Sequence, residues 1–256
     1  MTVNDIIESL TDVVCPDLAE EWDNIGLLVG DVNALVSRVI IALDCTRETI
    51  EQALDKKAEL IITHHPLIFR PIDRVTNQTP TVAILLSLIK NNIALYTAHT
   101  NLDNAEGGTN DVLFKVLDLK DKTVIPGGFL CRVGTPSKTY TLMEFTRFVA
   151  EKLSSGGVSF VGDGHAPVKK IGLCAGSGGK QEYMDLVKSN GCDTYLSGDI
   201  SYHQARYAEG IALNVISAPH FSTEAPVAEA LRGYLEKKIT DVCFYTQENQ
   251  RDVFNY

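Results

Sequence analysis

Short apolar runs alternate with helical patterns along this chain, and the alternation restricts its fold more than any other sequence feature. Residues 39–43 and 59–63 are predicted to be buried strands, with a helix between them that Thr46 would cap. Further strands are expected at 93–96, 170–174, 194–196, 214–216 and 241–246, and further helices at 79–91, 141–154, 180–190 and 224–237. Strands that alternate with helices build a parallel or mixed sheet, so the chain is predicted to be an α/β protein.

The order of these elements is repeated within the chain. Residues 37–66 give a strand, a helix and a strand, and residues 168–201 give a strand, a glycine-rich turn, a helix and a strand. The residues themselves hardly match, but the spacing does, which predicts an internal duplication. We therefore expect one lobe from residues 1–124 and 201–256, and a second, structurally similar lobe from residues 125–200.

Two adjacent histidines follow one of the predicted strands. His64, His65 and Pro66 come directly after the run 59–63. Neighbouring residues within a strand point to opposite faces of the sheet, so both rings can share a site only if the strand has ended. Pro66 favours that end, because it has no N–H group for the strand ladder and keeps the preceding residue extended.

Other strand ends also carry imidazoles, and these are followed by carboxylates. His99 comes four residues before Asp103, and His220 comes four residues before Glu224. Ligands in such sheets bind beyond the carboxyl ends of the strands, which would bring these groups together. Ser222 or Thr223 would cap the final helix, placing Glu224 in its first turn, where the helix dipole favours a negative charge.

Imidazoles and carboxylates in this number indicate a metal site with two ions. A catalytic zinc usually keeps about three protein ligands, which is fewer than this set offers. Two ions about 3.5–4 Å apart, with a bridging carboxylate and a bridging water, fit the set better. The alternative is that these residues only form hydrogen bonds around loops. His165 lies in a glycine-rich turn and is expected to face solvent, whereas the chemistry of His203, in a polar helix, is left open.

Composition narrows the class of function. The net charge of −10 argues against nucleic-acid binding, which needs clustered lysine and arginine. The six cysteines have no C-x-x-C spacing and are expected to be buried thiols in a cytoplasmic protein. The N-terminus has no signal-peptide pattern, and no apolar run is long enough to span a bilayer.

The glycine-rich run 176–180 is interpreted as a tight turn, with anion binding as the alternative.

The motifs resemble those of the Nif-three-like proteins, also called type 2 homologues of GTP cyclohydrolase I. The matching stretches run from end to end of the chain and lie at residues 21–27, 43–46, 63–67, 98–103, 197–199 with His203, and 220–224. Two differences stand out. The chain lacks the long middle insertion of some members, and it has Asp199 where glutamate is common.

The resemblance implies the Nif-three-like fold, with duplicated mixed-sheet lobes, and a toroidal homohexamer. It also implies two divalent ions per subunit, such as zinc, iron, manganese or nickel. His64 and His220 would bind one ion, and His65 and Asp103 the other, with Glu224 bridging both. In this arrangement the lobe of residues 1–124 and 201–256 is the metal-binding lobe. His99 would lie beside the site, either as a group that supports the ligands or as a proton carrier.

Three functions are compatible with these features. The first is a metal-dependent hydrolase that acts on a small substrate such as a nucleotide or another phosphoester, with His99 or His203 carrying the proton. The second is a non-enzymatic metal carrier, chaperone or regulatory scaffold, because no substrate-specific motif is present. The third, an interaction protein linked to transcription, has only the family name behind it. We favour the hydrolase.

Overall fold

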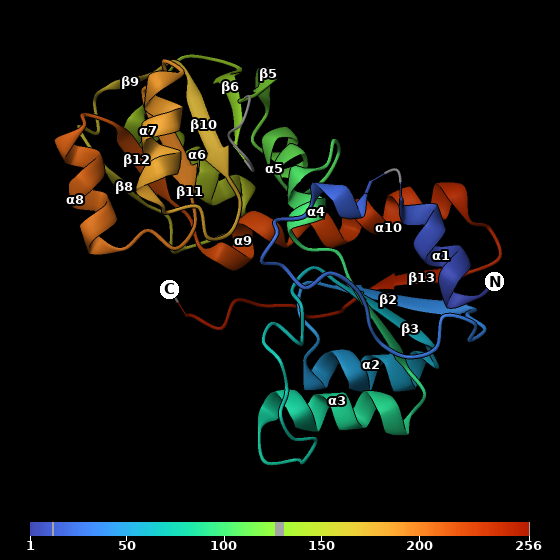
Figure 1. Cartoon of the computed structure of the whole chain (residues 1–256). Coiled ribbons are helices and arrows are strands. Elements are labelled where there is room, and N and C mark those ends of the chain that lie inside the picture. Colours follow the sequence, from blue (N-terminus) through green and yellow to red (C-terminus); the bar gives the residue numbers. More distant parts are fainter. Residues whose placement is uncertain (12, 126–130, 256) are drawn as a thin grey trace. The chain divides into compact units, whose positions relative to one another are not determined.

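The computed structural model describes residues 1–11, 13–125 and 131–255, which divide into two compact units (Figure 1). Unit 1 consists of Met1–Gly108 and Val227–Gln250. Unit 2 consists of Thr109–Pro226 and the C-terminal residues from Arg251 onward.

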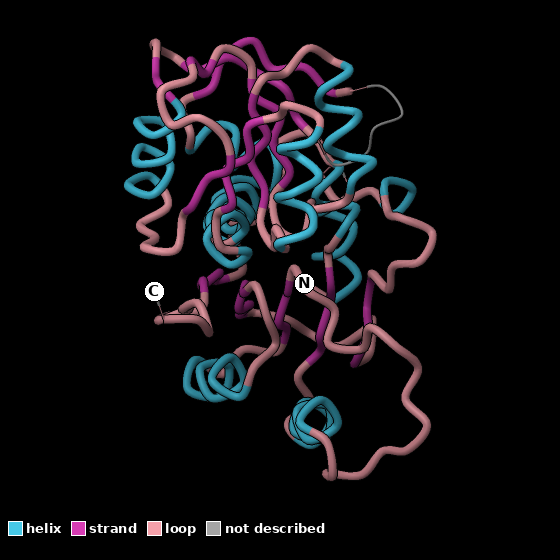
Figure 2. The backbone as a smooth tube through the Cα atoms, turned by 90° about the vertical axis from the view of Figure 1, so that its left-hand side faces the viewer, coloured by secondary structure: helices cyan, strands magenta, loops and turns pink. Residues whose placement is uncertain are grey.

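Unit 1 is built on a five-stranded sheet with helices on both faces. Its strands, in spatial order, are β1 (Gly26–Val29), β4 (Ala94–Thr97), β3 (Leu60–Thr63), β2 (Arg38–Ala42) and β13 (Cys243–Thr246). All neighbours pair in parallel except β1, which is antiparallel to β4. Helices α2 (Arg47–Lys56) and α3 (Pro80–Lys90) cover one face, and α1 (Val3–Leu10) and α10 (Pro226–Lys238) cover the other (Figure 1). Figure 2 shows α2 and α3 nearly end-on beneath the strands.

The helices of unit 1 begin and end where local chemistry dictates. Thr46 caps α2 by accepting a hydrogen bond from the N–H group of Thr49, and Lys57 ends the helix in the left-handed conformation. Thr79 caps α3, and Pro80 occupies the first helical position, as the sequence predicted. Two short helices complete the unit, the 3-10 helix Pro16–Leu18 and α4 (Thr100–Asn104).

Unit 2 contains a six-stranded mixed sheet. Its strands, in spatial order, are β5 (Leu119–Val124), β6 (Arg132–Pro136), β10 (Ile171–Cys174), β11 (Thr194–Ser197), β12 (Asn214–Ser217) and β8 (Ser159–Val161). Strands β10, β11 and β12 are parallel, and the outer strands run antiparallel to their neighbours. A separate pair, β7 (Tyr140–Thr141) and β9 (Pro167–Val168), lies outside this sheet. The helices are α5 (Thr109–Val116), α6 (Leu142–Lys152), α7 (Gln181–Ser189), α8 (Tyr202–Gly210) and α9 (His220–Glu224).

Alternating side chains of the second sheet fill two cores. Leu173, Leu196 and Ile216 pack on one face with residues of α5 and α6. Tyr195 and Val215 pack on the other face with residues of α7 and α8. This is the period-two pattern of strands buried on both sides, and it explains why the central strands of the sheet are apolar throughout.

The two sheets share one layout, so the predicted duplication is confirmed. In unit 1 the order β2, α2, β3, α3, β4, α4 produces three parallel strands followed by a short helix. In unit 2 the order β10, α7, β11, α8, β12, α9 does the same. In both units an antiparallel strand, β1 or β8, extends the sheet beyond the third parallel strand.

The observed unit boundaries differ from the expected lobes of residues 1–124 with 201–256, and 125–200. Strand β12 pairs with β11, and β5 pairs with β6, so the backbone ladders hold both segments in unit 2. Only the segment from Val227 to Gln250 returns to unit 1, where β13 joins β2. His220 and Glu224 therefore belong to unit 2.

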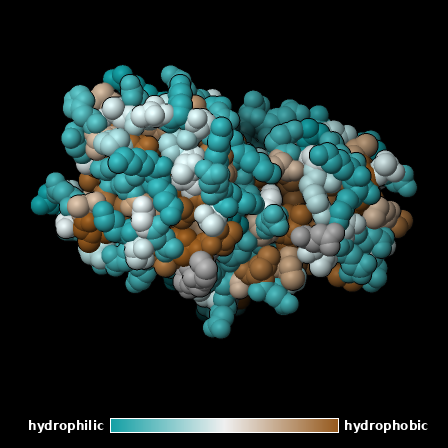
Figure 3. Space-filling model, turned by 90° about the horizontal axis from the view of Figure 1, so that it is seen from above, coloured by the Kyte–Doolittle hydropathy of each residue, from teal (hydrophilic) through white to brown (hydrophobic). Residues whose placement is uncertain are grey.

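Hydrophilic groups predominate on the face shown in Figure 3, and hydrophobic groups form small patches among them. No helix among the described residues is both long and apolar enough to cross a membrane. Cys45, Cys131, Cys174 and Cys192 are buried as predicted, whereas Cys243 is exposed.

Candidate metal centre

Three imidazoles of unit 1 gather at the carboxyl ends of β3 and β4. Strand β3 ends at Thr63, directly before His64, so both histidine rings can lie on the same side of the chain end. The centroids of the His64 and His65 rings are 5.0 Å apart. Ligand atoms of His64, His65 and His99 all lie within 4.8 Å of one another, which is close enough for one metal ion to contact them. The two adjacent histidine rings therefore lie close together, as the strand end before them predicted.

The His64 ring is fixed by a backbone carbonyl. Its Nδ1 lies 2.9 Å from the carbonyl oxygen of Ala98, which can only accept, so Nδ1 carries the proton. The lone pair is then on Nε2, which lies 3.4 Å from Oδ1 of the buried Asp103. Two buried acceptor atoms facing each other repel unless a cation, either a proton or a metal ion, lies between them.

Carboxylates orient the other two rings of unit 1. His65 Nδ1 lies 2.8 Å from Asp44 Oδ1, and His99 Nδ1 lies 2.9 Å from Asp23 Oδ1. A carboxylate that accepts from Nδ1 fixes the tautomer and leaves Nε2 as the ligand atom, an arrangement common among metal-binding histidines. Sequence reasoning did not assign Asp23 or Asp44 to the site.

Asp23 is a strong acceptor in this arrangement. Its Oδ2 accepts hydrogen bonds from both the N–H and the hydroxyl group of Thr100, at the start of α4. Burial raises the pKa of Asp23, but the hydrogen bonds from His99 and Thr100 outweigh it and lower the pKa to about 2. Asp23 is therefore ionised at neutral pH and attracts the Nδ1 proton of His99.

Unit 2 provides a second set of metal-binding groups on α9. His220 begins this five-residue helix and Glu224 ends it, so their side chains lie one turn apart, with Nε2 and Oε2 separated by 2.9 Å. His220 Nδ1 lies 2.7 Å from Asp199 Oδ2. Burial lowers the pKa of His220, but Glu224 and Asp199 outweigh it and raise the pKa to about 9. Asp199 thus has a clear role here despite its departure from the usual glutamate.

The predicted place of Glu224 in the first turn of the final helix is wrong. Pro226 begins α10 and has no N–H group to continue the hydrogen bonds of α9, so the two helices are separate. Glu224 lies at the end of α9, where the helix dipole does not favour its charge. Its carboxylate is instead held beside the imidazole of His220.

The glycine-rich turn after β10 packs directly against this carboxylate. Gly176 has a φ of +63°, and a Cβ atom there would lie 1.8 Å from Glu224 Oε1. Its N–H group donates to Thr223 Oγ1, and the Gly178 N–H group donates to Ser197 Oγ. These N–H groups are used within the unit, so the turn supports α9, as the tight-turn interpretation implied.

The remaining two histidines belong to neither group of potential metal ligands among the described residues. His203 is exposed on α8, with its ring 5.5 Å from that of Tyr202. His165 is exposed in the turn before β9, as expected.

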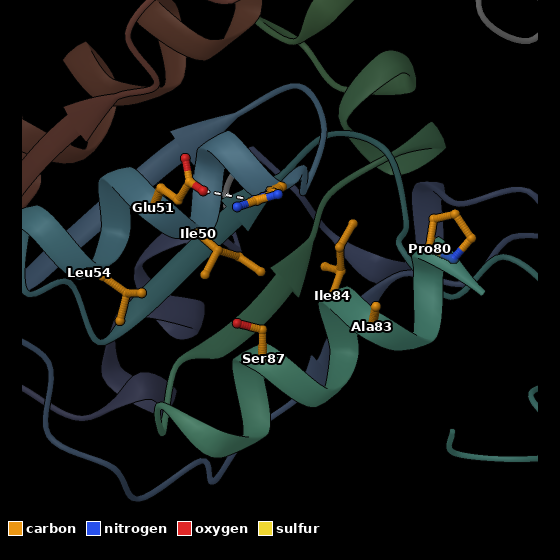
Figure 4. Close-up of a pocket in the computed structure, with 8 residues that line it drawn as sticks. Ile50, Glu51, Leu54, Pro80, Ala83, Ile84 and Ser87 are labelled. Carbon is orange, nitrogen blue, oxygen red and sulfur yellow. Dashed lines mark hydrogen bonds and ion pairs between the residues drawn. The ribbon is translucent and has the colours of Figure 1, made fainter. Parts of the chain in front are cut away.

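A groove of about 500 Å³ lies between α2 and α3 and is lined by Ile50, Leu54 and Ile84 (Figure 4). The described lining contains no imidazole, so this groove is separate from the histidine cluster.

The side chains present fit divalent metal ions. All four clustered imidazoles have Nδ1 beside an oxygen acceptor, which leaves Nε2 to bind an ion. Asp103 and Glu224 add carboxylates next to two of these Nε2 atoms. Imidazole with carboxylate suits zinc, iron, nickel and manganese.

These observations define a class of protein: a duplicated α/β fold that carries imidazole–carboxylate clusters after its parallel strands. The sequence matches the Duf34/NIF3 (NGG1p interacting factor 3) family over residues 1–251. The chain therefore belongs to the Duf34/NIF3 family, as its motifs indicated.

Individual relatives agree with this assignment. A protein of Clostridium perfringens named GTP cyclohydrolase 1 type 2 homolog is 35% identical over 263 residues, covering 100% of both chains. A Bacillus cereus protein related to NIF3 has a crystal structure that matches with a TM-score of 0.94 at 24% identity, covering 100% of this chain and 99% of that one. A hypothetical protein of Staphylococcus aureus matches with a TM-score of 0.93 at 28% identity and the same coverage.

Proposed function

We propose that this protein is a metal-dependent hydrolase whose centre holds two divalent ions. The proposed ligands are His64, His65, Asp103, His220 and Glu224. The observation that carries the proposal is the uniform orientation of the imidazoles, each with Nδ1 beside an oxygen acceptor.

The ions would supply Lewis acidity, which polarises the bond to be cut and lowers the pKa of water. The protein supplies orientation and proton transfer. Because Asp23 accepts from His99 Nδ1, the atom of His99 that takes up and releases a proton is Nε2. His203, exposed on α8, is the alternative proton carrier. The proposed substrate is a small phosphoester or nucleotide.

Metal analysis of the purified protein tests this proposal first. We expect two ions per chain, and we expect the loaded protein to hydrolyse at least one member of a panel of nucleotides and phosphoesters. His65→Gln should lower metal content and abolish turnover. His165→Gln makes the same chemical change in an exposed turn and should preserve both. Full activity after complete removal of metal would refute the hydrolase.

The same experiment distinguishes the hydrolase from its main alternative, a metal carrier. A protein that binds two ions, passes them to a chelator or an acceptor protein, and turns over none of the panel is a metal carrier. The toroidal homohexamer stays a prediction of the family resemblance, and the cytoplasmic location stays a prediction from the cysteine pattern. Light scattering on the purified protein tests the first, and cell fractionation tests the second.

A further inference from the structure

An aromatic corner made of Trp22, Phe69 and the His99 ring lies in unit 1. The ring centroids are 5.9 Å apart for Trp22 and Phe69, 6.2 Å for Trp22 and His99, and 6.5 Å for Phe69 and His99. The corresponding angles between ring planes are 65°, 77° and 83°. Three ring planes that are close to mutually perpendicular form the walls of a corner.

The corner adjoins the imidazole cluster. The His99 ring is 5.2 Å from the His64 ring and 5.7 Å from the His65 ring, so the same His99 side chain borders both the aromatic rings and the proposed ligands. A molecule that lies against Trp22 or Phe69 with one edge toward His99 would therefore present that edge to the proposed reaction centre.

Hydrogen bonds hold the corner in place. Asn24 donates from its side chain to the carbonyl oxygen of Ile68, which ties the segment of Trp22 to the segment of Phe69. Asp23, between Trp22 and Asn24, accepts from the His99 ring. One short stretch of chain thus holds the His99 ring and joins the segments that carry the other two rings, as expected of a preorganised binding site.

The exposure of these rings is unusual for structural residues. Trp22 is 54% exposed and Phe69 is 50% exposed, although burying such side chains generally stabilises a fold. The two rings meet edge to face, so their mutual contact uses only part of each ring surface. Exposed aromatic surface next to polar groups that converge is the common composition of a small-molecule site.

We propose that Trp22 and Phe69 bind a planar conjugated heterocycle of one or two rings and thereby select the substrate of the proposed hydrolase. The inference rests on the proposed function for its catalytic meaning. A flat π-system suits the corner because it can stack on one aromatic ring while its edge meets the others. A sugar or a simple phosphate has no such face and gains little from these walls.

Trp22 is the only tryptophan of the chain, which provides a direct probe. In the metal-loaded protein, adenosine and cytidine should shield Trp22 from acrylamide quenching in a saturable way, whereas ribose at equal concentration should not. By equilibrium dialysis, Phe69→Leu and Trp22→Leu should each weaken nucleoside binding by about 5- to 150-fold, the usual range for losing one base–aromatic stack.

Matched controls and metal analysis make the test decisive. Phe254→Leu changes an exposed phenylalanine of the C-terminal segment and should leave nucleoside affinity unchanged. Ribose binding as tightly as adenosine, or equal affinities of Phe69→Leu and Phe254→Leu, would overturn the proposal. The proposal would also be overturned if the shielding of Trp22 depended on protein concentration and not on nucleoside concentration. A second copy of the chain would then cover the rings.

Metal content, measured in the same samples, separates the two proposals. Normal metal content without nucleoside binding refutes the aromatic site and leaves the metal centre intact. Nucleoside binding by a protein that takes up no metal supports the aromatic site and refutes the proposed hydrolase.

Discussion

The substitution Gly176→Ala separates metal binding from folding in unit 2. Its Cβ atom would lie 1.8 Å from Glu224 Oε1 and 3.2 Å from His220 Nε2. Real side chains do not approach so closely, so the carboxylate must move. It is the end of a flexible side chain and can rotate aside at little cost to the fold, but it then leaves the position beside His220 where we expect the ion.

A backbone penalty is added to this displacement. Gly176 has a φ of +63°, and an alanine in the left-handed region costs about 1–2 kcal/mol. Gly191 gives the matched control, since it has a φ of +76° and open space where a Cβ atom would lie. In the metal-free protein both alanine variants should lose about 1–2 kcal/mol of unfolding free energy, which lowers Tm by roughly 2–8 °C in a chain of this size.

Metal affinity should distinguish the two variants. Gly176→Ala should bind zinc more than about tenfold more weakly than the wild type, because it misplaces a proposed ligand, whereas Gly191→Ala should bind normally. Competition against a chromophoric chelator gives the affinities, and urea denaturation gives the stabilities. Wild-type affinity in Gly176→Ala, or equal losses of affinity in both variants, would refute the role given to Glu224.

Three further predictions concern charge and metal. Asp111→Ala should destabilise the metal-free protein by about 3–5 kcal/mol in urea denaturation, because it removes the carboxylate to which Arg132, only 1% exposed, donates across 2.6 Å. Glu51→Ala, which breaks an exposed ion pair, should cost less than about 1 kcal/mol. The pKa of Asp23 is lowered to about 2, so its ionised form stabilises the fold above its ordinary pKa near 3.8, and this contribution is lost as pH falls through 2. The difference in unfolding free energy between wild type and Asp23→Asn should therefore shrink between pH 5 and pH 2, and a constant difference would contradict this linkage. Finally, added zinc should raise the Tm of the metal-free protein in proportion to the logarithm of its concentration, and an unchanged Tm would exclude binding to the folded state.

The elements that the sequence predicted well are those with strong local chemistry. Apolar strands followed by polar ends were located to within a residue or two, as β3 and β10 show. Helix α3 begins at Pro80 because Thr79 and Pro80 form an unambiguous start. Strand β5, by contrast, was missed, because its pattern Leu119–Val124 is mostly charged and exposed. It is a strand only because it pairs with β6, a long-range contact that local propensity does not report.

The candidate site shows the same division between local and distant information. His64 and His65 could be placed together because a strand end and a proline adjoin them in sequence. Asp23 could not be assigned, since it is 76 residues from His99 and follows no strand. Asp44 had a usable signal, because a carboxylate directly after a buried strand lies at the same sheet edge as His65.

The repeated layout of the two sheets has a consequence for how the chain arose. In each unit two residues separate the third parallel strand from the short helix that follows it, α4 or α9, and an acid follows an imidazole at a distance of four residues. Such a correspondence is what tandem doubling of a half-length gene leaves behind. The two halves would then have begun with identical side chains. Fusion removed that symmetry, so that one half could accumulate imidazoles at its strand ends while the other kept a single one there, His220.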